Sequence, residues 1–309
     1  MNELLTVSPS PHIKTNQTTR RVMLDVLIAL APAAIAGVVI FGLRALAVLA
    51  VSTASAVLCE YLFNLICRRP HTVGDLSAAV TGLLLGMNLP ANLPLWQAAV
   101  GSAFAIIVVK CLFGGIGKNF ANPAITARIF MTISFASLAK AAVPTVVDTV
   151  ATASPLSEMK GGAGVSASLT DMLLGLKSGA VGEVCAVALL VGFVYLLCRR
   201  VITWHTPVCF VGTVFLLTLL FSGDAGVALT HVLTGGLLLG AIFMATDYVT
   251  TPVSKWGRAL FGVGCALITV VIRLWGAYPE GVSFSILLMN ILTPYLDRLT
   301  QPRVLGGAK

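Results

Sequence analysis

The sequence predicts an all-α membrane protein that crosses the bilayer about ten times. Hydrophobic residues make up 57% and charged residues only 10% of the 309 residues, and the mean hydropathy is +0.95, which is too apolar for a water-soluble domain. A net charge of +8 would suggest a nucleic-acid partner in a soluble protein. Here the basic residues stand singly or in pairs at the ends of apolar runs, so we predict no nucleic-acid partner.

Ten apolar segments are predicted to be the membrane helices, because each approaches the roughly 20 residues that a crossing needs. They cover residues 22–42, 45–67, 76–93, 95–113, 121–142, 181–198, 201–221, 226–246, 260–275 and 282–296. Several are short or interrupted by Gly and Pro. One or two are therefore expected to be half-helices that end at the midplane and line a protein cavity.

The distribution of basic residues predicts the orientation. With a cytoplasmic N-terminus, thirteen Lys and Arg residues lie inside and four lie outside, namely Arg44, Lys140, Lys160 and Lys177. This bias predicts that both termini are cytoplasmic. The chain then divides into a cytoplasmic segment 1–21, a first membrane repeat 22–142, an extracytoplasmic loop 143–180, a second membrane repeat 181–297 and a cytoplasmic tail 298–309.

Two pairs of similar stretches indicate an internal duplication. TGLLLG at 81–86 matches TGGLLLG at 234–240, and VVKCLFGG at 108–115 matches VVIRLWGA at 270–277, in the same order. In the predicted topology the first matched helix runs outward and the second runs inward. The halves are therefore expected to be inverted repeats of five helices each. The alternative is chance similarity between helices rich in Leu and Gly.

The sequence predicts no metal site and no complete catalytic site. Its seven cysteines are scattered and include no CxxC pair, which makes a disulfide framework or an iron–sulfur centre held by this chain alone unexpected. The four histidines do not have the spacing of metal ligands.

Acidic residues in the apolar segments are candidates for an ion pathway, because charge at membrane depth is costly and usually functional. The candidates, with Arg128 and Arg273 as counter-charges, are Asp25, Glu60, Asp75, Glu183, Asp247 and Asp297. Asp25, Asp75 and Glu183 each open an apolar segment, so helix capping is the alternative for them. Glu60 is the most deeply placed, and we assign the predicted pathway to Glu60 and Glu183.

Two polar motifs at helix ends are candidates for binding a cofactor. GGIGKNFANPA at 114–124 contains Asn119 and Asn122, and MATDYVTTP at 244–252 contains Thr246 and Asp247. Amide side chains and the free N–H groups of a helix start can bind carbonyl-rich rings or phosphates. The first motif lacks the spacing of a P-loop or dinucleotide fold. A turn or a helix cap is the alternative for both.

The polar run VDTVATASPL at 147–156 lies in the predicted extracytoplasmic loop. A long polar loop in so apolar a chain usually binds or carries something. The run offers the hydroxyl of Ser154, six residues after the carboxylate of Asp148.

Six stretches spread over nearly the whole chain together resemble one family, the D subunits of Rnf ion-translocating electron-transport complexes. This family is similar to the B subunit of the sodium-pumping NADH:quinone reductase. The stretches are SPSPHIKTNQTTRRVMLDVLIAL (8–30), DLSAAVTGLLLGMNLP (75–90), GKNFANPA (117–124), SGAVGEVCAVALLVGFVYLLCRRVITWHTP (178–207), FMATDYVTTP (243–252) and YPEGVSFSILLMNILTPYLD (278–297).

The resemblance implies an FMN joined through its phosphate to a Ser or Thr in the pattern D-x-x-S/T-G/A-A-T/S. Asp148 then holds the acidic position, Ala153 the small one, and Ser154 is the acceptor. Ala151 stands where a hydroxyl residue is usual, and Thr152 stands where a small residue is usual.

The resemblance further implies a non-covalent flavin such as riboflavin, a flavin transferase as a partner, and membrane and peripheral Rnf subunits around the chain. It implies a fold like that of urea channels in the bacterial inner membrane, with the flavin loop on the periplasmic or extracellular side. The chain would pass electrons from ferredoxin towards NAD, without an active site of its own, and couple them to sodium or proton transport. A solute channel without a redox role and a structural scaffold are the alternatives.

Overall fold

The structure, a computed structural model, describes residues 18–135, 138, 154–161 and 168–301. The helices of the first half are α1 (Thr19–Phe41), α2 (Leu43–Ile66), α3 (Ser77–Met87), α4 (Leu95–Ala103) with its π-helical continuation η2 (Phe104–Cys111), and α5 (Pro123–Ser134). A short 3-10 turn, η1 (Val73–Asp75), precedes α3. Two short helices follow, α6 (Pro155–Lys160) and α7 (Leu169–Leu174).

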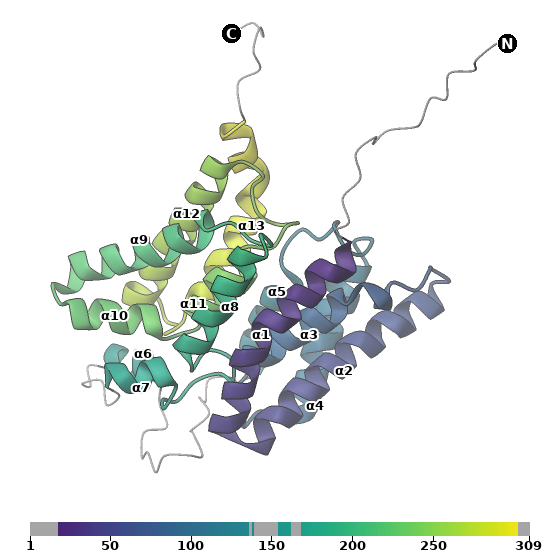
Figure 1. The fold of residues 1–309 in the computed structure, drawn as a ribbon, viewed down its shortest axis with the longest axis horizontal. Helices are drawn as coiled ribbons and strands as arrows, with labels where there is room; N and C mark the ends of the chain where they lie inside the picture. Colours follow the sequence, from purple (N-terminus) through teal and green to yellow (C-terminus); the bar gives the residue numbers. More distant parts are fainter. Residues whose placement is uncertain (1–17, 136–137, 139–153, 162–167, 302–309) are drawn as a thin grey trace, which may run out of the picture.

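The helices of the second half are α8 (Ala186–Cys198), α9 (His205–Ser222), α10 (Ala225–Leu233), α11 (Leu237–Leu239) with its π-helical continuation η4 (Gly240–Met244), α12 (Lys255–Trp275) and α13 (Val282–Leu299). Figure 1 shows the two halves side by side, α1–α5 in purple to blue and α8–α13 in teal to yellow. The predicted all-helical membrane class is confirmed for the described residues.

Four helices of the described chain, α1, α2, α9 and α12, are long and apolar enough to cross a membrane. A fifth crossing results if α10 and α11–η4 form one span bent by 60°. The expected segments 76–93, 121–142 and 181–198 contain helices of only 11, 12 and 13 residues. Hydropathy alone merges a short helix with the apolar loop beside it, which is why these three were expected to be longer.

Helix starts follow local sequence signals. The Asn122 side chain accepts from Ala124 N at 3.0 Å at the start of α5, where Pro123 occupies the first helical position. Ser254 accepts from Gly257 N at 2.8 Å at the start of α12. A side-chain acceptor followed by Pro or by a free N–H is a strong helix start, because the first N–H groups of a helix have no partner within it.

Small residues bring the two halves together. Helix α1 packs against α8, and α5 packs against α13. A β-carbon on Gly192 of α8 would lie 2.3 Å from Ala29 O of α1, and one on Gly37 of α1 would lie 2.3 Å from Val181 O. Only glycine permits this approach. The backbone of α1 thus lies directly against the backbone of α8 and of the segment that precedes α8.

Candidate functional site

Each half of the protein contains a helix break. The first covers residues 88–94 between α3 and α4, and the second covers residues 234–236 between α10 and α11. The segment 176–185, which precedes α8, reaches the first break through its backbone. Val181 N donates to Leu89 O at 3.0 Å, and Gly182 N donates to Met87 O at 2.7 Å.

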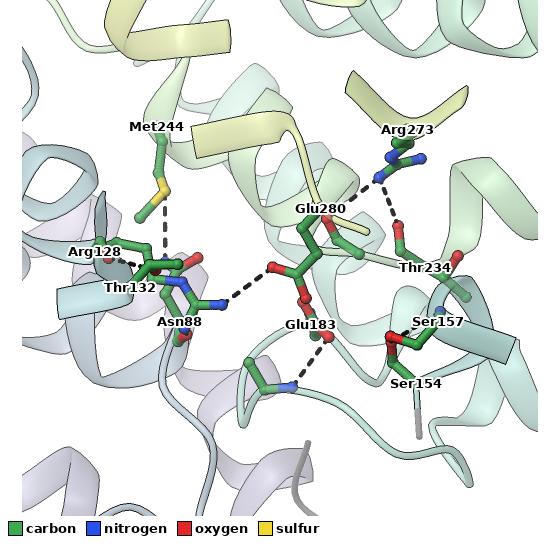
Figure 2. Close-up of polar contacts among 12 residues, drawn as sticks. Asn88, Arg128, Thr132, Ser154, Ser157, Glu183, Thr234, Met244, Arg273 and Glu280 are labelled. Atoms are coloured by element: carbon green, nitrogen blue, oxygen red, sulfur yellow. Dashed lines mark hydrogen bonds and ion pairs between the residues drawn. The ribbon is translucent and has the colours of Figure 1, made fainter. Parts of the chain in front are cut away.

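Glu183 joins this segment to the second break. Its Oε1 accepts from Ala180 N at 3.0 Å, and its Oε2 would lie 3.1 Å from a β-carbon on Gly236. Figure 2 shows Glu183 between Glu280 on one side and the loop that carries it on the other. The side chain is 7% exposed. The segment therefore bonds the first break through its backbone and contacts the second break through the Glu183 carboxylate.

The second break is possible because two successive glycines adopt left-handed backbone, Gly235 at φ +67° and Gly236 at φ +65°. The carbonyls that α10 leaves unpaired at its end need donors. Lys177 donates to Leu233 O, and Arg273 Nη2 donates to Thr234 O at 3.1 Å. Two buried cations thus replace the hydrogen bonds that the break removes.

An ion pair joins α5 to the segment before α13. Arg128 Nη2 lies 3.1 Å from Glu280 Oε2, and Arg128 also donates to Asn88 O in the first break. In the connecting segment, the side chains of Glu183 and Lys177 are both buried.

Ser154 caps the short helix α6. Its Oγ accepts from Ser157 N at 3.4 Å and lies 3.0 Å from Ser157 Oγ. Leu156 packs onto the second break, since its Cδ1 would lie 2.2 Å from a β-carbon on Gly235. Lys160 anchors the other end of α6 by donating to Tyr278 O at 2.8 Å.

The rest of the predicted attachment motif, Asp148, Thr152 and Ala153, lies outside the described residues. The structure therefore places the predicted acceptor hydroxyl, but not its neighbours in the motif.

The two candidate cofactor motifs meet at the end of η4. Asn122 Nδ2 donates to Met244 O at 3.3 Å. Thr246 donates to Ile242 O at 2.6 Å, and Asp247 accepts from Thr250 Oγ1 at 3.2 Å, so both close a local turn. Burial raises the pKa of Asp247.

Asn119 differs from the other residues of these motifs. Its Oδ1 is one of five buried side-chain atoms in the described residues that have no hydrogen-bond partner. A buried amide oxygen without a partner is costly, so this oxygen is free to accept from a ligand.

Glu60 lies in a separate polar cluster. Its Oε1 lies 2.8 Å from Lys110 Nζ and accepts from Thr72 Oγ1 at 2.8 Å, and Lys110 also donates to Ser77 Oγ at 2.6 Å. The side chains of Lys110 and Glu60 are 3% and 2% exposed. The partners of Glu60 come from α4–η2 and the segment before α3, and none belongs to the helix breaks.

The three acidic residues for which helix capping was the alternative differ in their hydrogen-bond partners. Asp75 accepts from Ser77 N at 2.8 Å before α3, as a cap does. Asp25 does not cap α1; it lies inside the helix, accepts from Tyr195 Oη of α8 at 3.0 Å and pairs at 3.2 Å with Nε of Arg199, which follows α8. Glu183 does not cap α8, because its bond is to Ala180. Helix capping is thus wrong for Asp25, which bonds residues far away in the sequence, and for Glu183, which bonds a residue that precedes it.

Sequence reasoning missed two of the ionisable residues around the helix breaks, Glu280 and Lys177. Glu280 was not singled out, although it stands alone between apolar segments 260–275 and 282–296. Lys177 was used only as a charge for orientation. A single ionisable residue beside an apolar segment was the available signal for both.

Comparison with known proteins identifies the family of the chain. The model of the NQR2, RnfD, RnfE family matches residues 6–306, which is nearly the whole chain. The chain belongs to this family.

Among curated members of the NQR2, RnfD, RnfE family, the chain is 46% identical to the D subunit of the Na(+)-translocating ferredoxin:NAD(+) oxidoreductase complex of Acetobacterium woodii, over 100% of this chain and 98% of that protein. It is 39% identical to the D subunit of the proton-translocating ferredoxin:NAD(+) oxidoreductase complex of Clostridium ljungdahlii, over 98% and 96%. It is 32% identical to the D subunit of the ion-translocating oxidoreductase complex of Escherichia coli, over 98% and 99%. The resemblance noted from the sequence is confirmed.

Proposed function

We propose that this chain is the membrane-embedded D subunit of an ion-translocating ferredoxin:NAD(+) oxidoreductase complex, and that it carries electrons through an FMN esterified to Ser154. The names of relatives that match along their full length support the complex. The observation that carries the flavin assignment is the position of Ser154. Its hydroxyl stands at the start of α6, which Leu156 packs against the second helix break and which Lys160 joins to Tyr278 O.

Ser154 fits the chemical requirements of such an attachment. A phosphoester needs a protein hydroxyl, and Ser157 Oγ at 3.0 Å can donate to the ester oxygen once Ser154 has lost its own proton. A flavin attached there would pass one or two electrons. The chain would hold the flavin beside the buried charges of the second break.

The direct test is mass spectrometry of the Ser154 peptide from the complex purified from its native host. We expect the peptide to carry the mass of FMN less one water. A peptide found only in unmodified form would contradict the electron-carrier function. That result would leave two alternatives, a solute channel and a structural scaffold. Solute flux in vesicles would distinguish them, because only a channel would show it.

We also propose that the fold consists of two inverted repeats of five helices in an arrangement like that of urea channels, with both termini cytoplasmic and α6 on the opposite side. The pairing of α1 with α8 and of α5 with α13 supports this, because a pseudo-two-fold axis brings equivalent helices together. Buried cations in the matched stretches, Lys110 and Arg273, support it further.

A second, non-covalent flavin such as riboflavin is proposed at the end of η4. The unpartnered Oδ1 of Asn119 and the contact of Asn122 with Met244 O support this site, and Thr246 and Asp247 stand in the adjacent turn. Amide groups in such a place can bond the carbonyl and N–H groups of a flavin ring.

Glu183 is proposed as the residue that couples electron flow to a sodium ion or a proton. Its carboxylate is buried, and its segment bonds one helix break and contacts the other, which is the type of place where transporters bind ions. Glu60 is less suited to this role because Lys110 neutralises it at 2.8 Å.

This assignment predicts different outcomes for two conservative variants. In vesicles that contain the complex, Glu183→Gln is expected to lower ferredoxin-dependent ion uptake roughly tenfold or more, as expected for a costly intramembrane carboxylate that is functional. Glu60→Gln is expected to leave uptake per assembled complex close to that of the wild type. The reverse pattern would assign the pathway to Glu60 instead.

A further inference from the structure

One buried guanidinium in the described chain has no carboxylate within ion-pair distance. Arg273 of α12 is 4% exposed. Its Nη groups donate to three backbone carbonyls, those of His231, Thr234 and Gly235, while its Nε is buried without a partner. The ion pairs of the described residues do not include Arg273. A buried charge that is satisfied only by neutral groups is less stable than a paired one.

The matched stretch of the first half also carries a buried cation, and that cation is paired. Lys110 lies in VVKCLFGG, one position before the residue that matches Arg273 of VVIRLWGA, and Glu60 lies 2.8 Å from it. The two cations thus stand at adjacent positions of the matched stretches, but only Lys110 has a carboxylate within ion-pair distance. The ion pairs of the described residues give Arg273 no such anion.

The neighbouring charges do not supply this anion. Around the second break the ionisable side chains are Arg128, Lys177 and Arg273 against Glu183 and Glu280, and Glu280 is already bonded to Arg128 at 3.1 Å. His231, whose carbonyl accepts from Arg273, also has a buried Nδ1 without a partner. Glu158 and Lys160 of α6 balance each other, so these described residues carry one positive charge more than negative ones.

The helix that carries Ser154 covers this point. Leu156 Cδ1 and Arg273 Nη2 both contact the same side of Gly235, at 2.2 Å and 2.9 Å from the position of its missing β-carbon. Figure 2 shows Ser154 and Ser157 below Thr234, the residue whose carbonyl accepts from Arg273. An anion attached to Ser154 would thus belong to the helix that contacts Gly235, the residue that Arg273 also contacts.

We propose that Arg273 is the counter-charge for the phosphodiester of the flavin on Ser154. This inference rests on the proposed attachment of FMN. A phosphodiester carries one negative charge, which balances the excess at the second break, and its oxygens accept hydrogen bonds from guanidinium groups. Arg273 is a positioning residue in this assignment: it fixes the phosphate, and with it the flavin, against the broken helix. The competing explanation is that Arg273 serves only the carbonyls of α10.

The test is a thermodynamic cycle on the full-length chain, produced with and without a flavin transferase and solubilised in detergent. We expect attachment of FMN to raise the wild-type Tm by about 2 °C or more, since the attached phosphate contacts Arg273 only in the folded state. The increment should persist in Arg273→Lys, which keeps the charge, and disappear in Arg273→Gln. Arg199→Gln, the same type of change at an exposed arginine, should keep it.

An equal rise in Tm on FMN attachment in the wild type and in Arg273→Gln would overturn the proposal. If Arg273→Gln does not fold, hydrogen exchange of the wild-type chain decides instead. We expect attachment to slow exchange in residues 155–160 and 230–236, and unchanged exchange would overturn the proposal. Mass spectrometry of the Ser154 peptide in the same samples separates this failure from that of the proposed function, because a peptide without FMN refutes the attachment itself.

Discussion

Ser154→Ala is expected to remove all covalently bound flavin from this chain. A phosphoester needs a side-chain hydroxyl, and Ser154 is the residue that the attachment pattern and the position of α6 assign to it. The measurement is in-gel fluorescence under ultraviolet light after denaturation, with the chain co-expressed with a flavin transferase. We expect a yellow-green band for the wild type and a dark band for the variant.

Two further variants make this result specific. Ser154→Thr keeps a hydroxyl and should retain the band. Ser157→Ala removes the neighbouring hydroxyl at 3.0 Å and should also retain it. Loss of the cap on α6 costs only about 1 kcal/mol, so the Ser154→Ala chain should still assemble. Acid extraction of that variant should then release the proposed non-covalent flavin. A band that survives in Ser154→Ala would place the attachment on another residue.

Lys110→Met is expected to be the most destabilising single change among the buried cations. It leaves Glu60 buried beside an apolar group, with Oε2 already lacking a partner, and removing one member of a buried pair typically costs about 3–5 kcal/mol. The expected result is a loss of several degrees in the Tm of the full-length chain in detergent, together with lower yield in the membrane.

The matched control for this prediction is the double variant Lys110→Met with Glu60→Met. It removes both charges and keeps apolar volume, so it should recover most of the lost stability. If Lys110→Met alone costs less than about 1 kcal/mol, the lysine is not compensating Glu60. Glu60 would then be as strong a candidate for the ion pathway as Glu183.

The sequence determined the class, the family and many of the helix starts, because these depend on composition and on short-range patterns. Apolar runs predicted the all-helical membrane class, and the segment expected from residue 121 contains α5, which begins at Pro123. Six stretches in a fixed order identified the family, which the match over residues 6–306 confirms. The candidate motifs with Asn122 and Thr246 were also found from the sequence, although nothing in it placed them together.

Only the tertiary structure decided which apolar segments are broken and which charges meet. Hydropathy does not distinguish one helix from a short helix and a buried loop, because both are apolar, so α3, α5 and α8 were expected to be longer than they are. The pairing of Arg128 with Glu280 joins residues 152 positions apart. Such contacts, and the absence of a counter-charge at Arg273 among the described residues, depend on how the two halves pack, which no local pattern records.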